Sequence, residues 1–99
     1  MFGLNKILQQ LQQSENDFRK IVVCVERGDG AVGLFMNGLQ EVVEVRFGAD
    51  APDLLAAGRL AAMLGEAFNE ALRESRRLLK EEISRLTGVS NLPEIPGIF

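Results

Sequence analysis

Residues 21–47 read IVVCVERGDGAVGLFMNGLQEVVEVRF, and this stretch decides the fold. Its first five residues are apolar and mostly β-branched, which is typical of a strand buried on both faces. Gly28-Asp29-Gly30 supplies the positive-φ residues of a hairpin turn, and Asn37-Gly38 is the pair favoured in a type I′ turn. The stretch therefore predicts a three-stranded antiparallel meander, with the second and third strands at Ala31–Met36 and Leu39–Phe47.

The third predicted strand alternates between apolar and polar side chains, so we expect one of its faces to meet water. The apolar set is Leu39, Val43, Val45 and Phe47, and the polar set is Gln40, Glu44 and Arg46. Glu41 falls on the apolar side, at the point where the strand leaves the hairpin.

A helix is predicted on each side of the meander. The first covers residues 1–20 and has a narrow apolar stripe that suits a seam against another helix: Leu4, Ile7, Leu8, Leu11 and Phe18. The second covers residues 53–87, and its expected buried face carries Leu60, Leu64, Phe68, Ala71, Ser75, Leu79 and Leu86.

The ends of the second helix carry capping residues. Asp50 can cap free amides, Pro52 suits the first turn, and Gly88 is a suitable terminator. Gly58 and Gly65 are the points at which the helix can break, because each costs roughly 1 kcal/mol relative to Ala. Residues 89–99 carry two prolines and are expected to form an extended tail.

The whole chain, residues 1–99, is expected to be one α+β domain. An unbroken second helix of about 34 residues would span about 50 Å. Because a domain of this size has a radius of gyration of only about 13 Å, that helix must protrude. A protruding helix with an apolar stripe needs cover, and a second copy of the chain is the simplest source. We therefore expect a homodimer with protruding helices.

The charge of the chain is unevenly distributed. Lys and Arg number 11 and Asp and Glu number 14, for a net charge of −3, which argues against a strongly basic protein that coats nucleic acid. Residues 26–53 carry two cations and six carboxylates, while the rest of the chain has a net charge of +1. The acidity therefore belongs to the predicted sheet and not to the helices.

Composition also excludes several kinds of chemistry. Histidine is absent, which removes Ser-His-Asp and Cys-His catalysis and imidazole zinc sites. With no nucleophile–base pair and no metal-ligand cluster in the pattern, we expect neither enzyme activity nor a cofactor or small-molecule substrate. The single cysteine, Cys24, lies in an apolar strand and is expected to be a buried core thiol in a reducing cytoplasm. No apolar run approaches the ~20 residues of a membrane span.

Four cations recur along the second helix at i, i+3, i+4 and i+7: Arg73, Arg76, Arg77 and Lys80. This spacing places them on one side of the helix, roughly opposite its apolar face. They can form a solvated surface with intrahelical ion pairs, namely Glu70–Arg73, Glu74–Arg77 and Arg77–Glu81, and the pattern alone favours this interpretation. They can also form a strip that contacts phosphates and is doubled by dimer symmetry.

Two further motifs do not indicate a site. Residues 28–33 match the spelling G-x-G-x-x-G, but they join two predicted strands and not a strand to a helix, so a dinucleotide site is excluded. Glu66, Glu70 and Glu74 recur every four residues, yet no Glu-x-x-His pattern accompanies them, and we expect them on the surface.

Several segments together resemble the YbaB/EbfC family of bacterial nucleoid-associated proteins. No single segment is specific, but their order and spacing are: Met1-Phe2-Gly3 before a Gln-rich helix, Gly28-x-Gly30 before a strand that enters Asn37-Gly38, Val45-Arg46-Phe47, Leu60 to Ala71 with Ala67-Phe68-Asn69-Glu70-Ala71, and a tail from Leu92-Pro93 through Pro96-Gly97 to Phe99.

The resemblance implies a helix–meander–helix homodimer that binds double-stranded DNA with little sequence preference. It also implies a place in the cytoplasm at the nucleoid, with a part in nucleoid organisation and gene regulation. The family's DNA contacts lie on its helices, so the resemblance points to Arg73, Arg76, Arg77 and Lys80, and then to Lys6 and Arg85. The alternative is a dimeric protein-interaction adaptor without DNA contact, which the acidic sheet segment would suit.

Overall fold

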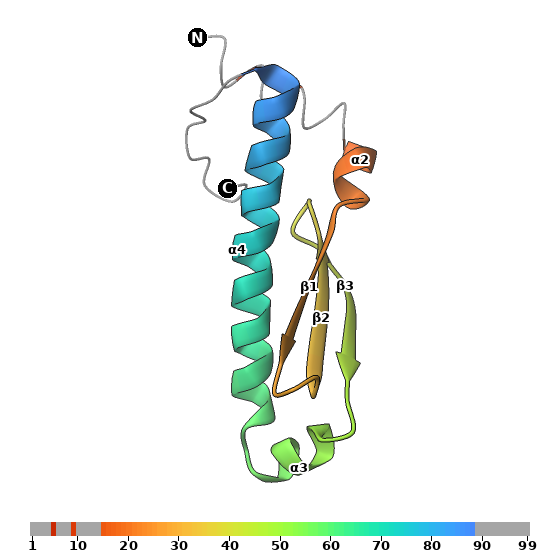
Figure 1. Cartoon of the computed structure of the whole chain (residues 1–99), viewed down its shortest axis with the longest axis vertical. Coiled ribbons are helices and arrows are strands. Elements are labelled where there is room, and N and C mark those ends of the chain that lie inside the picture. Colours follow the sequence, from red (N-terminus) through yellow and green to blue (C-terminus); the bar gives the residue numbers. More distant parts are fainter. Residues whose placement is uncertain (1–4, 6–8, 10–14, 89–99) are drawn as a thin grey trace.

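The three predicted strands form one antiparallel sheet, which lies against one long helix. The computed structural model describes residues 5, 9 and 15–88. Its elements are α2 (Glu15–Arg19), β1 (Val22–Arg27), β2 (Val32–Asn37), β3 (Val42–Phe47), α3 (Ala51–Ala56) and α4 (Leu60–Thr87). This confirms the helix–meander–helix order (Figure 1). Most of the first predicted helix, with Leu4, Ile7, Leu8 and Leu11, and the tail at 89–99 lie outside the described residues.

The sheet has the strand order β1-β2-β3, with both pairs antiparallel. The turn between β1 and β2 has positive φ at Gly28, Asp29 and Gly30, as its sequence predicts. Because it connects two paired strands, this turn does not have the strand-to-helix context of a dinucleotide-binding loop.

The second hairpin differs from the predicted two-residue turn. Asn37 is the last residue of β2, and positive φ occurs at Gln40 and not at Asn37 or Gly38. The Asn37 N–H donates to the Glu41 carbonyl at 3.0 Å, which encloses a three-residue loop. The type I′ prediction is therefore wrong, because the Asn37 side chain builds a longer loop by accepting from the N–H groups of Leu39 (2.9 Å) and Glu41 (3.1 Å).

The longer loop also changes the third strand. β3 begins at Val42 and not at the predicted Leu39. Phe35 pairs with Glu44 while Met36 pairs with Val42, so Val43 is the extra residue of a bulge. Val42 therefore takes the place predicted for Val43 on the apolar side, beside Val45.

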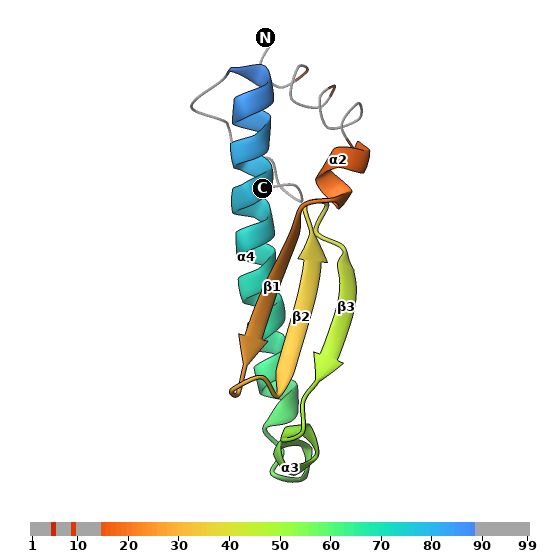
Figure 2. The ribbon, with the colours of Figure 1, turned by 45° about the vertical axis from the view of Figure 1, so that its right-hand side comes forward.

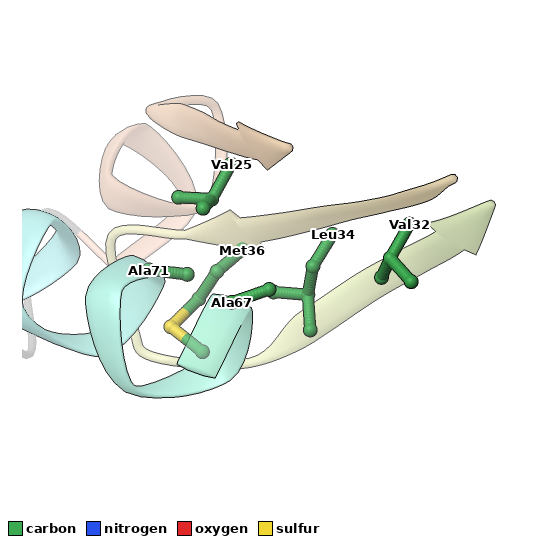
Figure 3. Packing of buried hydrophobic residues seen from close by; sticks show 6 residues of the cluster. All are labelled: Val25, Val32, Leu34, Met36, Ala67 and Ala71. Carbon is green, nitrogen blue, oxygen red and sulfur yellow. The ribbon is translucent and has the colours of Figure 1, made fainter. Parts of the chain in front are cut away.

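Helix α4 covers β1 and β2 and leaves β3 uncovered (Figure 2). The core between them consists of Val25, Val32, Leu34, Met36, Ala67 and Ala71 (Figure 3). Small Ala side chains on the helix allow it to approach the larger side chains of the strands.

Because α4 covers a single face of the sheet, the prediction that β1 is buried on both faces is wrong. Val25 points to the core and is 6% exposed, whereas Val22 on the opposite face is 49% exposed. Cys24 is exposed as well, so the expected core thiol is wrong. The apolar run predicted burial, but no described helix lies over that second face of the sheet.

The helical region begins at Ala51 and breaks once. Gly58 has a φ of 73° between α3 and α4, whereas α4 continues through Gly65. Asp50 holds the N-cap position of α3, but its side chain makes no capping hydrogen bond. Gly88 ends α4 with a φ of 72°, as predicted.

The buried face of α4 agrees with the predicted one at Ala71, Ser75 and Leu79, and Leu60 and Leu64 pack against the core as well. Ala67, Ala71, Ser75, Leu79 and Ile83 are buried, at a spacing of four residues. Phe68 was expected on this face but is 38% exposed. With 28 residues α4 spans about 42 Å, in a molecule whose longest extent is 53 Å, and it continues beyond the end of the sheet (Figure 1).

Candidate nucleic-acid interface

A hydrogen bond fixes the point where α4 passes the end of the sheet. The buried Ser75 hydroxyl donates to the Asn37 carbonyl at 2.7 Å, at the last residue of β2. A hydroxyl in a helix interior is otherwise a weak choice, so this bond explains the polar residue on the buried face. The turns of α4 from Arg76 onward therefore project past the sheet (Figure 1).

The four predicted cations lie on this part of α4 but do not have equivalent surroundings. Arg73, Arg77 and Lys80 are exposed, whereas Arg76 is half-buried. The Arg76 Nε donates a long 3.4 Å hydrogen bond to the Gln40 side chain in the second hairpin loop. Arg76 therefore lies at the edge of the strip that faces the sheet.

Arg77 is occupied by two carboxylates of its own helix. Its Nη2 lies 2.8 Å from Glu74 and its Nη1 lies 2.6 Å from Glu81. The hydrogen bond from Arg77 holds the pKa of Glu74 below its usual value of 4.5, and Glu74 in turn raises the pKa of Arg77. These are two of the three ion pairs that the solvated-surface interpretation predicts.

The third expected pair, Glu70–Arg73, does not form. Glu70 instead lies 2.8 Å from Arg27 at the end of β1. Arg73 is left without an ion pair in the described part of the chain.

The looser candidates differ from this group. Arg85 pairs with Glu82, one turn away on α4, and this contact lowers the pKa of that carboxyl. Lys6 lies outside the described residues.

Ion pairing separates the cations of the structure into two sets. Among residues 15–88, six of ten cations have a carboxylate partner: Arg19, Lys20, Arg27, Arg46, Arg77 and Arg85. The four without one are Arg59, Arg73, Arg76 and Lys80. Three of these four belong to the predicted strip, so the positive charge that remains available is concentrated on one side of α4.

Arg59 is the cation that the sequence pattern did not single out. It is exposed at the N-cap position of α4, at the opposite end of the helix from Lys80. A cation at a helix N-terminus opposes the helix dipole and gains no local stabilisation there. This unfavourable position is the sequence signal that could have identified Arg59 as a candidate.

An uncovered apolar surface, here called the β3 face, lies beside α4. Val42, Val45 and Phe47 pair with residues that point to the core, so they share the helix-side face of the sheet, yet they are 43%, 37% and 56% exposed. A cavity of about 470 Å³ opens at the end of the β3 face next to α3, lined by Phe47, Gly48, Ala51, Pro52, Leu55 and Leu60.

Phe68 extends the β3 face onto α4. Glu70 reaches β1 through Arg27, and Phe68 lies about 200° around the helix from Glu70, on the side toward β3. An apolar surface of this extent on one side of a small domain is typical of an interaction surface.

Other chemistry has little support in the described part of the chain. Within residues 5, 9 and 15–88, no group of three His, Cys, Asp or Glu side chains could hold a metal ion, and Glu66 and Glu74 are surface residues of α4. None of the described helices is long and apolar enough to cross a membrane.

Comparison with known proteins gives consistent results. The YbaB/EbfC DNA-binding family matches residues 1–90. A nucleoid-associated protein of Pelotomaculum thermopropionicum is 32% identical over 98% of this chain and 96% of its own. One from Legionella pneumophila strain Corby is 33% identical over 89% of this chain and 78% of its own. The crystal structure of the uncharacterized protein HP0035 from Helicobacter pylori shares the fold, with a TM-score of 0.68 and 19% identity over 84% of this chain and 96% of that one.

Proposed function

The chain belongs to the YbaB/EbfC DNA-binding family, and on this basis we propose that it binds double-stranded DNA as a homodimer, through phosphate contacts made by α4. It acts as a nucleoid-associated protein in the cytoplasm and takes part in nucleoid organisation and gene expression. It is a binding protein and not an enzyme.

The observation that carries the proposal is the set of available cations on α4. Arg73, Arg76 and Lys80 have no carboxylate partner in the described structure and lie within about 10 Å along the helix axis. Arg and Lys side chains neutralise phosphates and release counterions, which is the main source of sequence-independent affinity for DNA. The contacts of this strip are therefore directed to the DNA backbone.

Weak sequence preference follows from the same chemistry. Phosphate contacts position a protein on the duplex but do not read bases. Trp and Tyr are absent from the chain, so stacking on bases is left to Phe alone. The six carboxylates of residues 26–53 repel DNA from the sheet, which leaves α4 as the side that approaches it.

The β3 face supports the homodimer. A second copy that covers Val42, Val45 and Phe47 would remove exposed apolar side chains from water and would fill the cavity beside Leu55. A twofold axis would then double the strip of cations.

The experiment is a salt titration of DNA binding by the purified full-length protein. Three phosphate contacts per protomer give about six per dimer, and the plot of log K against log salt should have a slope of about −5. The R73Q/K80Q variant removes four of these contacts and should flatten the slope by 3 to 4 units. R46Q is the matched control, because Arg46 lies on the sheet and pairs with Glu44.

Two results would contradict the proposal. A slope that R73Q/K80Q leaves unchanged would remove α4 as the contact surface. Absence of DNA binding at low salt would favour the alternative function, a dimeric protein-interaction adaptor without direct DNA contact.

A further inference from the structure

One cation of the strip is already neutralised by carboxylates of its own helix. Arg77 directs Nε and Nη2 to Glu74, at 3.2 and 2.8 Å, and Nη1 to Glu81 at 2.6 Å. Each of its three nitrogens thus donates to a carboxylate, and one N–H on each Nη remains free. Arg77 nevertheless lies between Arg73 and Lys80 on the same side of α4.

We propose that Glu74 and Glu81 compete with DNA phosphates for Arg77 and thereby limit the affinity of α4 for DNA. This inference rests on the proposed function. Because two carboxylates already neutralise Arg77, it can supply its charge to a phosphate only by giving up a carboxylate, and exchange of one anion for another releases no counterion. The two carboxylates also repel phosphates that approach Arg73 and Lys80.

The exposure of the three side chains allows this exchange. The side chains of Arg77, Glu74 and Glu81 are 54%, 44% and 61% exposed. Exposed helical ion pairs are weak and worth about two-fold each in an equilibrium constant. The competition is therefore strong enough to reduce affinity and weak enough to be overcome by DNA.

The expected effect of removing the competitors follows from the number of pairs. E74Q removes one pair from each of two protomers and should tighten DNA binding about four-fold. E74Q/E81Q should tighten it ten-fold or more. It should also steepen the salt slope by about 2, because Arg77 in each protomer then neutralises a phosphate.

E66Q is the matched control. Glu66 lies on the same helix, about 180° around it from the sheet-facing Ser75 and within about 20° of Arg73 and Arg77. It has no ion pair in the described structure. Glu→Gln keeps size and helix propensity, so helicity by circular dichroism should be equal for all variants. If only the net charge mattered, E66Q and E74Q would tighten DNA binding equally. Competition for Arg77 predicts instead that E66Q tightens DNA binding less than two-fold.

A double-mutant cycle isolates the role of Arg77. In an R77Q background, E74Q/E81Q should tighten binding no more than a bulk-charge change does. If E74Q matches E66Q, or if the gain of E74Q/E81Q persists with R77Q, the inference is overturned. In that case DNA binding that still depends on Arg73 and Lys80 leaves the proposed function intact, whereas no binding by any variant overturns both.

Discussion

Phe47 is the residue at which the expected dimer can be tested most directly. It is 56% exposed on the β3 face, and a second copy that covers it would remove about 100 Å² of apolar surface from water. At about 25 cal/mol per Å², and allowing for the Cβ that alanine keeps, F47A should cost about 2 kcal/mol per copy. A symmetric interface contains the change twice, so the dimer should weaken by about 4 kcal/mol, or roughly a thousand-fold.

The assay is sedimentation equilibrium over a wide range of protein concentration. V22A is the matched control, because Val22 is 49% exposed but lies on the opposite face of the sheet. V22A should leave the dimer dissociation constant within about two-fold, since that face stays in water. Thermal melting of F47A at a concentration where it is monomeric should show a domain that is still folded.

The reasoning would be refuted by an F47A dimer as stable as the original. A weakened V22A dimer with an unchanged F47A dimer would move the interface to the other face of the sheet. A chain that stays monomeric at all concentrations would remove the homodimer and the doubling of the cations.

The other predictions concern stability. N37A removes a 97%-buried side chain that makes two hydrogen bonds to backbone N–H groups and one to a carboxylate. It should lower the free energy of unfolding by about 2–3 kcal/mol and Tm by about 10 °C or more. An unchanged Tm would contradict the role given to this loop. G48A should cost about 2 kcal/mol or more, because its Cβ would lie 2.4 Å from a backbone oxygen, whereas G33A, with its nearest contact at 3.9 Å, should melt as the original does. Because a hydrogen bond from Arg77 lowers the pKa of Glu74, the stability this carboxylate contributes is present above pH 4.5 and is lost as the pH falls through the lowered value. Tm should therefore fall less steeply below pH 4.5 in E74Q than in the original, and equal slopes would exclude the ion pair in solution.

Much of the fold follows from local sequence, because local chemistry determines it. Gly28-Asp29-Gly30 adopts the positive φ that its turn needs, and Gly58 and Gly88 break and end the helix for the same reason. The antiparallel order then follows from short connections between consecutive strands. These features need no knowledge of what packs on the sheet.

The errors arise where distant residues compete with local preference. Asn37-Gly38 suits a two-residue turn, but Asn37 bonds instead to Glu41 and to Ser75 of α4, which lies far along the chain. An apolar run in the sequence also does not show whether another part of the same chain covers that face of the strand. Val22 belongs to such a run and is exposed.

The sequence predicted the positions of the candidate cations and two of their three ion pairs, but not the third. The spacing of Arg73, Arg76, Arg77 and Lys80 follows from helix geometry alone. Which of them is available depends on Glu70, which the sheet draws to Arg27 and away from Arg73. Such a contact between a helix and a strand has no signature in the spacing of charges along the helix.

The hydrogen bonds around Asn37 also have a chemical consequence. Asparagine followed by glycine is prone to deamidation, in which the glycine nitrogen attacks the side-chain amide carbon. Here the Gly38 N–H donates to the Phe18 carbonyl at 3.0 Å, and the Asn37 amide is held by Glu41 at 2.8 Å. The folded hairpin should therefore protect Asn37 from deamidation, and isoaspartate at position 37 would accumulate only in molecules whose hairpin has opened.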